Sequence, residues 1–146
     1  MKKVIRQTSV VLTLLLFCAL PALSAGHASK TKTSGFNWNP VMDAIIQVES
    51  GGNTKAVSGN QVGAMQITPI LVKECNDILQ KRKSDKRYSM ADRYNVAKSK
   101  EMFLLIQSHH NPQNDVEKAI RVWNGGPKYS IRATNRYFKK VMSQLK

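Results

Sequence analysis

The sequence has few cysteines, few acidic residues and no apolar run long enough to cross a membrane. Its 146 residues include two Cys, and nine Asp or Glu against 23 Lys or Arg. Two cysteines exclude a disulfide-rich scaffold. The hydrophobic fraction of 42% and the charged fraction of 22% are ordinary for a globular protein and exclude a collagen-like, coiled-coil or disordered chain. The length fits one domain.

The N-terminus has a short basic segment followed by an apolar segment. Three basic residues precede position 10, and an apolar run over residues 10–20 is followed by Pro21 and small residues. This run is too short for a bilayer core, which needs about 20 residues. We therefore predict a signal peptide over residues 1–25 and a mature protein exported to the periplasm or the cell exterior.

Removing that segment changes the charge and the cysteine content. Residues 1–25 carry three Lys or Arg and no acid, so the formal charge falls from +14 to +11. Cys18 is lost as well, and Cys75 becomes the single cysteine. A charge of this size predicts an acidic partner. No nucleic-acid-binding motif is visible, so we expect the anionic cell envelope and no nucleic acid.

The rest of the chain is a short linker and one helical domain. Residues 26–36 are mostly Gly, Ser, Thr and Lys and predict a flexible linker. Residues 37–146 predict about five helices and little strand, which makes the domain all-α or nearly so. The expected helices start at the capping signals Asn39, Thr68, Ser89 and Asn114 and at Ile131, and run to about Glu49, Lys83, Ser108, Trp123 and Leu145.

Glu49 is the residue with the most chemical information. At 100° per residue it lies in the middle of the arc formed by the apolar side chains of residues 41–48. A carboxylate there is costly to bury unless something compensates it. It either reaches solvent from a frayed helix end, forms a buried ion pair, or is a general acid whose pKa burial has raised.

Further motifs follow Glu49-Ser50 in a fixed order. A polar loop contains Ser58, then comes the stretch Gly-Ala-Met-Gln-Ile over residues 63–67, and later the turn Trp-Asn-Gly-Gly over residues 123–126. This series resembles the soluble lytic transglycosylase family, whose pattern is Glu-Ser, a loop, Gly-Leu-Met-Gln, Ala-Tyr-Asn-x-Gly and Glu-Thr-x-x-Tyr. The resemblance covers residues 40–142.

The resemblance implies a lysozyme-like helical fold with a glycan-binding cleft. It also implies cleavage of the β-1,4 bond between N-acetylmuramic acid and N-acetylglucosamine in peptidoglycan strands. By position, Glu49 is the catalytic acid and base of such an enzyme. The substrate-binding positions are Ser50, Ser58, Met65, Gln66, Trp123, Asn124 and Tyr137.

The chain departs from the family pattern at three positions. Ala64 replaces leucine, Trp123 replaces tyrosine, and Ala133 stands where the family often has a glutamate. Glu101 is a possible second acid in place of the missing one. Its alternative role, a surface ion pair with a nearby lysine, is the favoured interpretation.

One good acid suits a transglycosylase, which forms a 1,6-anhydromuramoyl end by intramolecular attack and needs neither metal nor cofactor. The pair His109-His110 predicts favourable placement at a helix C-terminus and no metal site. Two alternatives stay open: a hydrolytic muramidase on the same fold, and a non-catalytic peptidoglycan-binding or assembly protein. The small size suggests a monomer that works beside an envelope-spanning secretion or conjugation machine.

Overall fold

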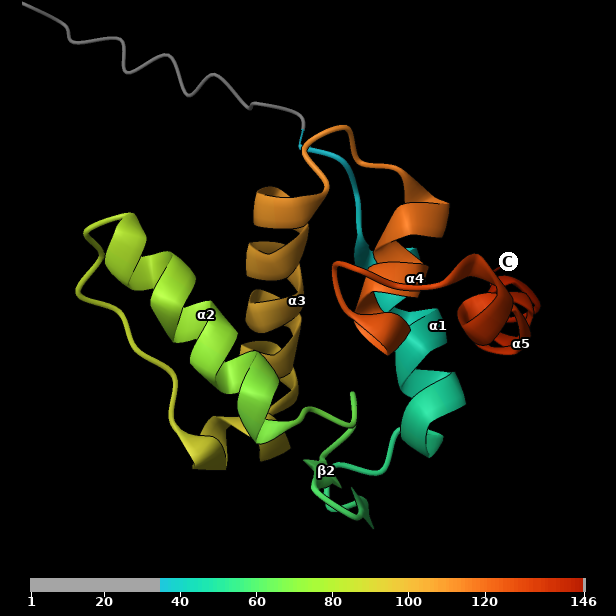
Figure 1. Cartoon of the computed structure of the whole chain (residues 1–146). Helices are drawn as coiled ribbons and strands as arrows, with labels where there is room; N and C mark the ends of the chain where they lie inside the picture. Colours follow the sequence, from blue (N-terminus) through green and yellow to red (C-terminus); the bar gives the residue numbers. More distant parts are fainter. Residues whose placement is uncertain (1–34, 146) are drawn as a thin grey trace, which may run out of the picture. The chain divides into compact units, whose positions relative to one another are not determined.

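The computed structural model describes residues 35–145, so the expected signal peptide and most of the expected linker lie outside the described residues. The elements are α1 (Asn39–Ser50), the short strands β1 (Val57–Ser58) and β2 (Gln61–Val62), α2 (Pro69–Lys81), the 3₁₀ helix η1 (Met90–Tyr94), α3 (Val96–His110), α4 (Val116–Gly125) and α5 (Ile131–Met142). Figure 1 shows their arrangement. The expectation of a nearly all-α fold with about five main helices is confirmed.

Side-chain caps fix where most of these helices begin. Thr68 accepts a hydrogen bond from the Leu71 amide, with Pro69 in the first turn of α2. Asn95, Asp115 and Ser130 accept in the same way at the starts of α3, α4 and α5. Because each cap satisfies an amide that has no partner inside the helix, these short polar residues set the boundaries.

The expected helix from Ser89 to Ser108 is two helices. Ser89 and Asp92 form the predicted capping box, but it opens η1, which ends after one turn at Tyr94. Asn95 has an extended backbone and caps a separate helix, α3. The helix expected from Asn114 begins one residue later, because Asn114 has a left-handed φ of 57° and Asp115 is the cap.

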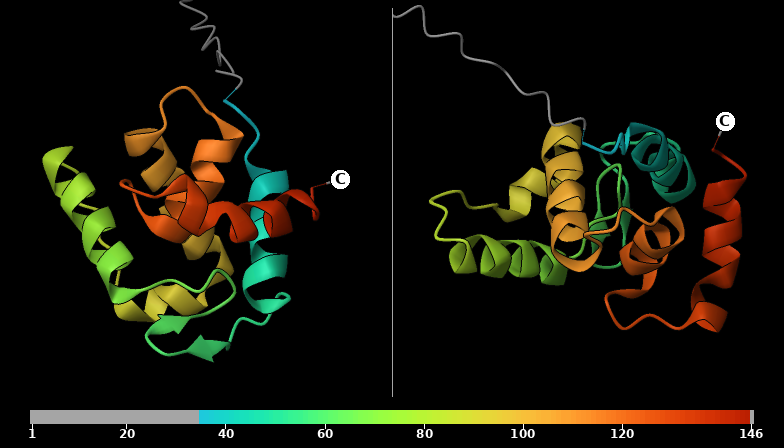
Figure 2. Two further views of the ribbon diagram at one scale, coloured as in Figure 1. Left: turned by 45° about the vertical axis from the view of Figure 1, so that its right-hand side comes forward. Right: turned by 90° about the horizontal axis from the view of Figure 1, so that it is seen from above.

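The helices pack in two groups. Helices α1, α4 and α5 contact one another, and α2, η1 and α3 contact one another. Figure 1 shows α2 and α3 on one side, α1, α4 and α5 on the other, and the hairpin at one end; the views of Figure 2 agree. The ring of Phe103 on α3 joins the groups, since it packs against Trp38 (5.6 Å between centroids) and Trp123 (5.3 Å). None of the helices in residues 35–145 has the length and hydropathy of a membrane span.

Candidate active site

Glu49 lies in the last turn of α1 and faces the rest of the domain. The helix ends directly after it, with Gly51 in the left-handed conformation at φ 60°. The predicted apolar face is present, because Val41, Met42, Ala44, Ile45 and Ile46 are all buried. Glu49 itself is partly buried. Burial disfavours the carboxylate form and raises the pKa of Glu49 above its ordinary value.

The hydroxyl of Tyr137 donates a hydrogen bond to Glu49 Oε1 at 2.7 Å. This bond stabilises the carboxylate and opposes part of the rise in the pKa of Glu49. Burial and the neighbouring Glu49 carboxylate raise the pKa of Tyr137, so the phenol stays a donor. Glu49 therefore faces a neutral partner and has no cation within ion-pairing distance among the described residues.

A buried arginine on α4 sets the position of α5 and of Tyr137 with it. The Arg121 guanidinium donates to the Ile131 carbonyl at 3.1 Å and to Thr134 Oγ1 at 3.0 Å. It lies over the Phe138 ring, 4.4 Å from the centroid, and its charge is paired with Glu117 at 2.7 Å. These contacts hold the two turns of α5 that include Tyr137.

The segment after the hairpin is bonded to the end of α1, next to Glu49. The Ser50 hydroxyl donates to the Ala64 carbonyl at 2.8 Å, which fixes the end of α1 against residues 63–66. Only glycine fits at position 63, because a Cβ there would lie 2.0 Å from the Arg93 carbonyl oxygen and φ is 79°. The Gln66 amide donates to the Gly63 carbonyl at 3.0 Å, which keeps the segment in a tight turn.

A cleft of about 630 Å³ opens in front of these groups. Five of the predicted site residues line it: Glu49, Gln66, Trp123, Asn124 and Tyr137. They come from α1, the segment after the hairpin, α4 and α5, so residues far apart in the sequence meet here. Ala133, where the family often has a glutamate, also lines the cleft.

The other predicted binding residues lie elsewhere. Met65 is fully buried in the hydrophobic core and does not line the cleft. Ser50 is engaged with Ala64, and Ser58 is exposed on the hairpin; neither lines the cleft. Motif spacing placed these residues near the site but did not indicate which side chains point into it.

Glu101 is on α3, outside the cleft lining. Its carboxylate pairs with Lys86 at 2.6 Å and with Lys98 at 3.3 Å. The hydrogen bond from Lys86 is the main reason why the pKa of Glu101 is lowered. This geometry matches the ion-pair interpretation.

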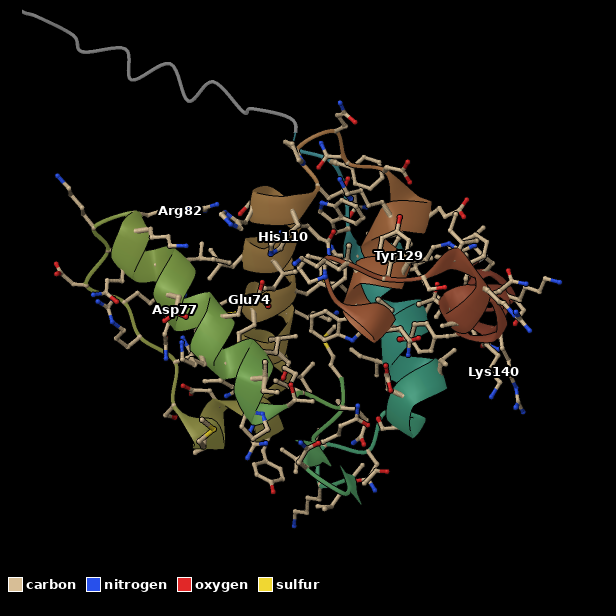
Figure 3. All side chains as sticks on the ribbon, in the orientation of Figure 1. Glu74, Asp77, Arg82, His110, Tyr129 and Lys140 are labelled. Carbon is tan, nitrogen blue, oxygen red and sulfur yellow. The ribbon has the colours of Figure 1, made fainter. Side chains whose placement is uncertain are left out.

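Three charged cleft residues were missed by the sequence analysis. Glu74 on α2 lines the cleft and is bonded to His110 Nε2 at 2.7 Å, while Arg136 and Lys140 line it from α5. Figure 3 labels Glu74, His110 and Lys140 and shows the first two on the α2 and α3 side and Lys140 on α5. Arg136 and Lys140 could have been found, because Lys140 lies three residues after Tyr137 and four residues after Arg136, which is the spacing of one helix face. Within residues 35–145, no cluster of three or more Asp, Glu, His or Cys is placed to hold a metal.

The fold and the cleft define a helical, lysozyme-like domain whose cleft is lined by two partly buried glutamic acids, Glu49 bonded to Tyr137 and Glu74 bonded to His110. The family model described as "Transglycosylase SLT domain" matches residues 27–146, so the chain belongs to this family. Neither the curated proteins nor the solved structures give a significant match. At the family level, the activity is of the lytic transglycosylase type, acts on peptidoglycan and is generally found outside the cytoplasm.

Proposed function

We propose that this protein is a peptidoglycan lytic transglycosylase that uses Glu49 as its single acid and base. Its substrate is the β-1,4 bond between N-acetylmuramic acid and N-acetylglucosamine. The observation that supports this most is the position of Glu49, partly buried at the cleft wall with a raised pKa and Tyr137 at 2.7 Å. A glutamic acid whose pKa is raised keeps its proton to higher pH and can act as a general acid.

The reaction proceeds in two proton transfers. Protonated Glu49 donates to the glycosidic oxygen as the bond from C1 of the muramoyl residue breaks. The resulting Glu49 carboxylate then removes the proton from the C6 hydroxyl of the same sugar, and O6 attacks C1. The products are a 1,6-anhydromuramoyl end and a free N-acetylglucosamine hydroxyl, and Glu49 is protonated again. The attack is intramolecular and consumes no water, so proximity supplies part of the rate.

The surrounding residues bind and orient the sugars in this proposal. Trp123 offers an aromatic face for a sugar ring, and Asn124 offers its side-chain amide for hydroxyl and acetamido groups. Gln66, whose Nε2 already donates to the Gly63 carbonyl, offers its amide oxygen as an acceptor. Tyr137 holds the Glu49 carboxyl in place. Ser58, Ser50 and Met65 act indirectly, through the hairpin and the wall of the cleft.

The hydrolytic alternative requires a second carboxylate to activate water. Glu101 lies outside the cleft lining, and the second carboxylate that does line it is Glu74, which is bonded to His110. We therefore keep the transglycosylase reaction as the proposal and treat Glu74 as the residue on which hydrolysis would depend.

Product analysis in ¹⁸O-labelled water distinguishes these reactions. Purified glycan strands digested by the protein should give anhydromuramoyl ends, lighter by one water than hydrolytic ends and free of label. A labelled reducing muramic acid would instead establish a muramidase, and Glu74→Gln would then be the first variant to test. Absence of cleavage would support the non-catalytic binding protein.

Export, the monomeric state and a role beside an envelope-spanning machine remain proposals from the sequence. N-terminal sequencing of the expressed protein should find a start between residues 25 and 29, and recovery of Met1 on a cytoplasmic protein would contradict export. Sedimentation of the purified protein tests the monomer.

A further inference from the structure

Helix α5 has an excess of positive charge that has no role in the proposed reaction. Its twelve residues include Arg132, Arg136, Lys139 and Lys140 and no acid. Arg136 and Lys140 line the cleft, whereas Arg132 and Lys139 do not. The helix therefore has two cations on the cleft side and two away from it.

The two cleft cations lie beside the residue that contacts Glu49. Ala133, Arg136, Tyr137 and Lys140 all line the cleft and follow the i, i+3, i+4, i+7 spacing of one helix face. Since Tyr137 donates to Glu49, a group bound by Arg136 and Lys140 would lie on the same helix face as the residue that contacts the candidate acid.

Neither cation is neutralised by an acid in the part of the chain that the structure describes. Among residues 35–145, the side chains of Arg136 and Lys140 form no ion pair and no hydrogen bond; only the backbone carbonyl of Lys140 accepts a hydrogen bond, from the Ser143 hydroxyl. Other cations near this cleft are matched: Arg121 pairs with Glu117 at 2.7 Å. The other acid in the lining, Glu74, is already bonded to His110 at 2.7 Å. Ala133, one turn before Arg136, offers no carboxylate.

We propose that Arg136 and Lys140 form a carboxylate-binding subsite that recognises the acidic substituent of the muramoyl residue. This inference rests on the proposed function and names the part of the substrate that α5 binds. Muramic acid differs from N-acetylglucosamine by a lactyl group, which is itself a carboxylate or carries a peptide that ends in carboxylates. A guanidinium and an ammonium four residues apart can bind one carboxylate through charge-assisted hydrogen bonds.

The subsite also explains how one cleft orients the strand. Both sugars of the repeat present similar hydroxyl and acetamido groups to Gln66, Trp123 and Asn124. The lactyl side chain occurs on every second sugar only, so a cationic wall on α5 selects the register that presents the muramoyl residue to Glu49. Chitin-like strands lack the carboxylate, so the cations of α5 cannot select one binding register for them.

The test is a binding measurement that needs no turnover. The disaccharide N-acetylglucosaminyl-β-1,4-N-acetylmuramic acid does not contain the bond that the reaction cleaves, so NMR titration of the full chain gives an affinity directly. Three probes are compared: the disaccharide with its lactyl carboxylate, the same disaccharide carrying a stem peptide, and its lactyl N-methylamide. We expect a carboxylate-bearing probe to bind at least about tenfold more tightly than the amide at low salt.

The double variant Arg136→Gln with Lys140→Gln should remove this preference, so that all three probes bind like the amide. The matched variant Arg132→Gln with Lys139→Gln loses the same charge from the same helix and should retain the preference within about twofold. A preference shown by only one of the two acidic probes identifies the lactyl group or the peptide as the source of the carboxylate.

Equal binding of the acid and the amide by the wild type would overturn the inference, as would equal losses in the two double variants or no binding of any probe. Strand digestion by the wild type is scored separately. Cleavage without carboxylate preference contradicts the subsite alone, and carboxylate preference without cleavage contradicts the proposed enzyme alone.

Discussion

Glu49 and Glu101 are glutamates on neighbouring helical groups, and their surroundings are opposite. Glu49, in the group of α1, α4 and α5, is partly buried and bonded to a neutral phenol, which leaves its pKa raised. Glu101, in the group of α2, η1 and α3, is more exposed and bonded to two lysines, which lower its pKa. One carboxyl is prepared to hold a proton and the other to stay charged.

The difference shows that a cation-rich chain can still keep one acid away from its cations. With 23 basic residues and nine acidic ones, a random acid would be expected to find a lysine. Glu49 avoids this because it lies on the buried, apolar face of α1 and the side chain bonded to it is the neutral phenol of Tyr137. Burial without a counter-charge is costly for stability, which is typical of a functional group.

The largest expected effect comes from removing the acid in the first group. Glu49→Gln keeps the size and the hydrogen-bonding capacity of the side chain but cannot donate and recover a proton. We expect strand cleavage to fall by at least about 100-fold, in line with general acid–base contributions. Initial rates on purified glycan strands measure this loss.

Thermal unfolding at pH 7 is the control for Glu49→Gln. Because burial raises the pKa of Glu49, its charged form costs the folded state stability at pH values above that pKa. The neutral variant should therefore melt at the same temperature or higher. Cleavage within a few-fold of wild type would show that another residue does the chemistry.

A smaller effect should follow from loosening α5. Arg121→Met keeps an extended side chain but removes the donors to the Ile131 carbonyl and to Thr134. We expect unfolding free energy to fall by about 1–3 kcal/mol and cleavage to fall by about tenfold, because Tyr137 is held less well. Arg121→Lys, which keeps the charge without the planar fork, should recover part of both. If the Arg121 variants lose stability but keep full activity per folded molecule, Arg121 does not position the active site.

Tyr137→Phe should change the acidity of Glu49 more than the rate. Loss of the hydroxyl removes the one contact that lowers the pKa of Glu49 and leaves burial unopposed, so that pKa rises further. Because the reaction starts from protonated Glu49, the alkaline limb of the pH–rate profile should move to higher pH, with a maximal rate about three- to tenfold lower. Tyr129→Phe, a tyrosine in the turn before α5, is the control and should leave the limb in place. An alkaline limb that stays in place or moves to lower pH after Tyr137→Phe would contradict the claim that the Tyr137 hydroxyl lowers the pKa of Glu49.

Much of the helical layout could be predicted because its signals are local. The caps at Thr68 and the apolar arc around Glu49 depend on a few neighbouring residues. The break at Asn95 was missed because a capping box opens an α-helix and a 3₁₀ turn equally well. Which of two adjacent polar residues caps a helix, as with Asn114 and Asp115, depends on backbone angles that spacing does not specify.

The residues of the site could be predicted from the sequence only where they belong to a family motif. Glu49, Gln66, Trp123, Asn124 and Tyr137 were placed in one cleft by resemblance, and the structure brings them together. Met65 occurs in the same motif and points into the core. Glu74, Arg136 and Lys140 belong to no motif, and their place at the cleft depends on how α2 and α5 pack, which is a long-range property.

The smallest effect is expected for Glu101→Gln, in the second group. Its ion pairs with Lys86 and Lys98 are partly exposed, and pairs of this kind contribute about 0–1 kcal/mol to folding. Since the pKa of Glu101 is lowered in the folded state, that contribution is present above the ordinary value of 4.5 and is lost as the pH falls below it. Wild type and variant should thus differ slightly in melting temperature at pH 7 and converge as the pH falls through the lowered pKa of Glu101, and high salt should also reduce the difference.

Cleavage by Glu101→Gln should stay within about twofold of wild type, with unlabelled anhydromuramoyl ends as before, because Glu101 does not line the cleft. Asp77→Asn, which breaks the exposed pair of Asp77 with Lys73, is the matched control for loss of a surface acid. A Glu101 variant that lost cleavage while Asp77→Asn kept it would place a second acid in the reaction. Glu49 would then act as the acid and Glu101 as the base. A carboxylate paired with lysine is charged at neutral pH and is therefore suited to accept a proton.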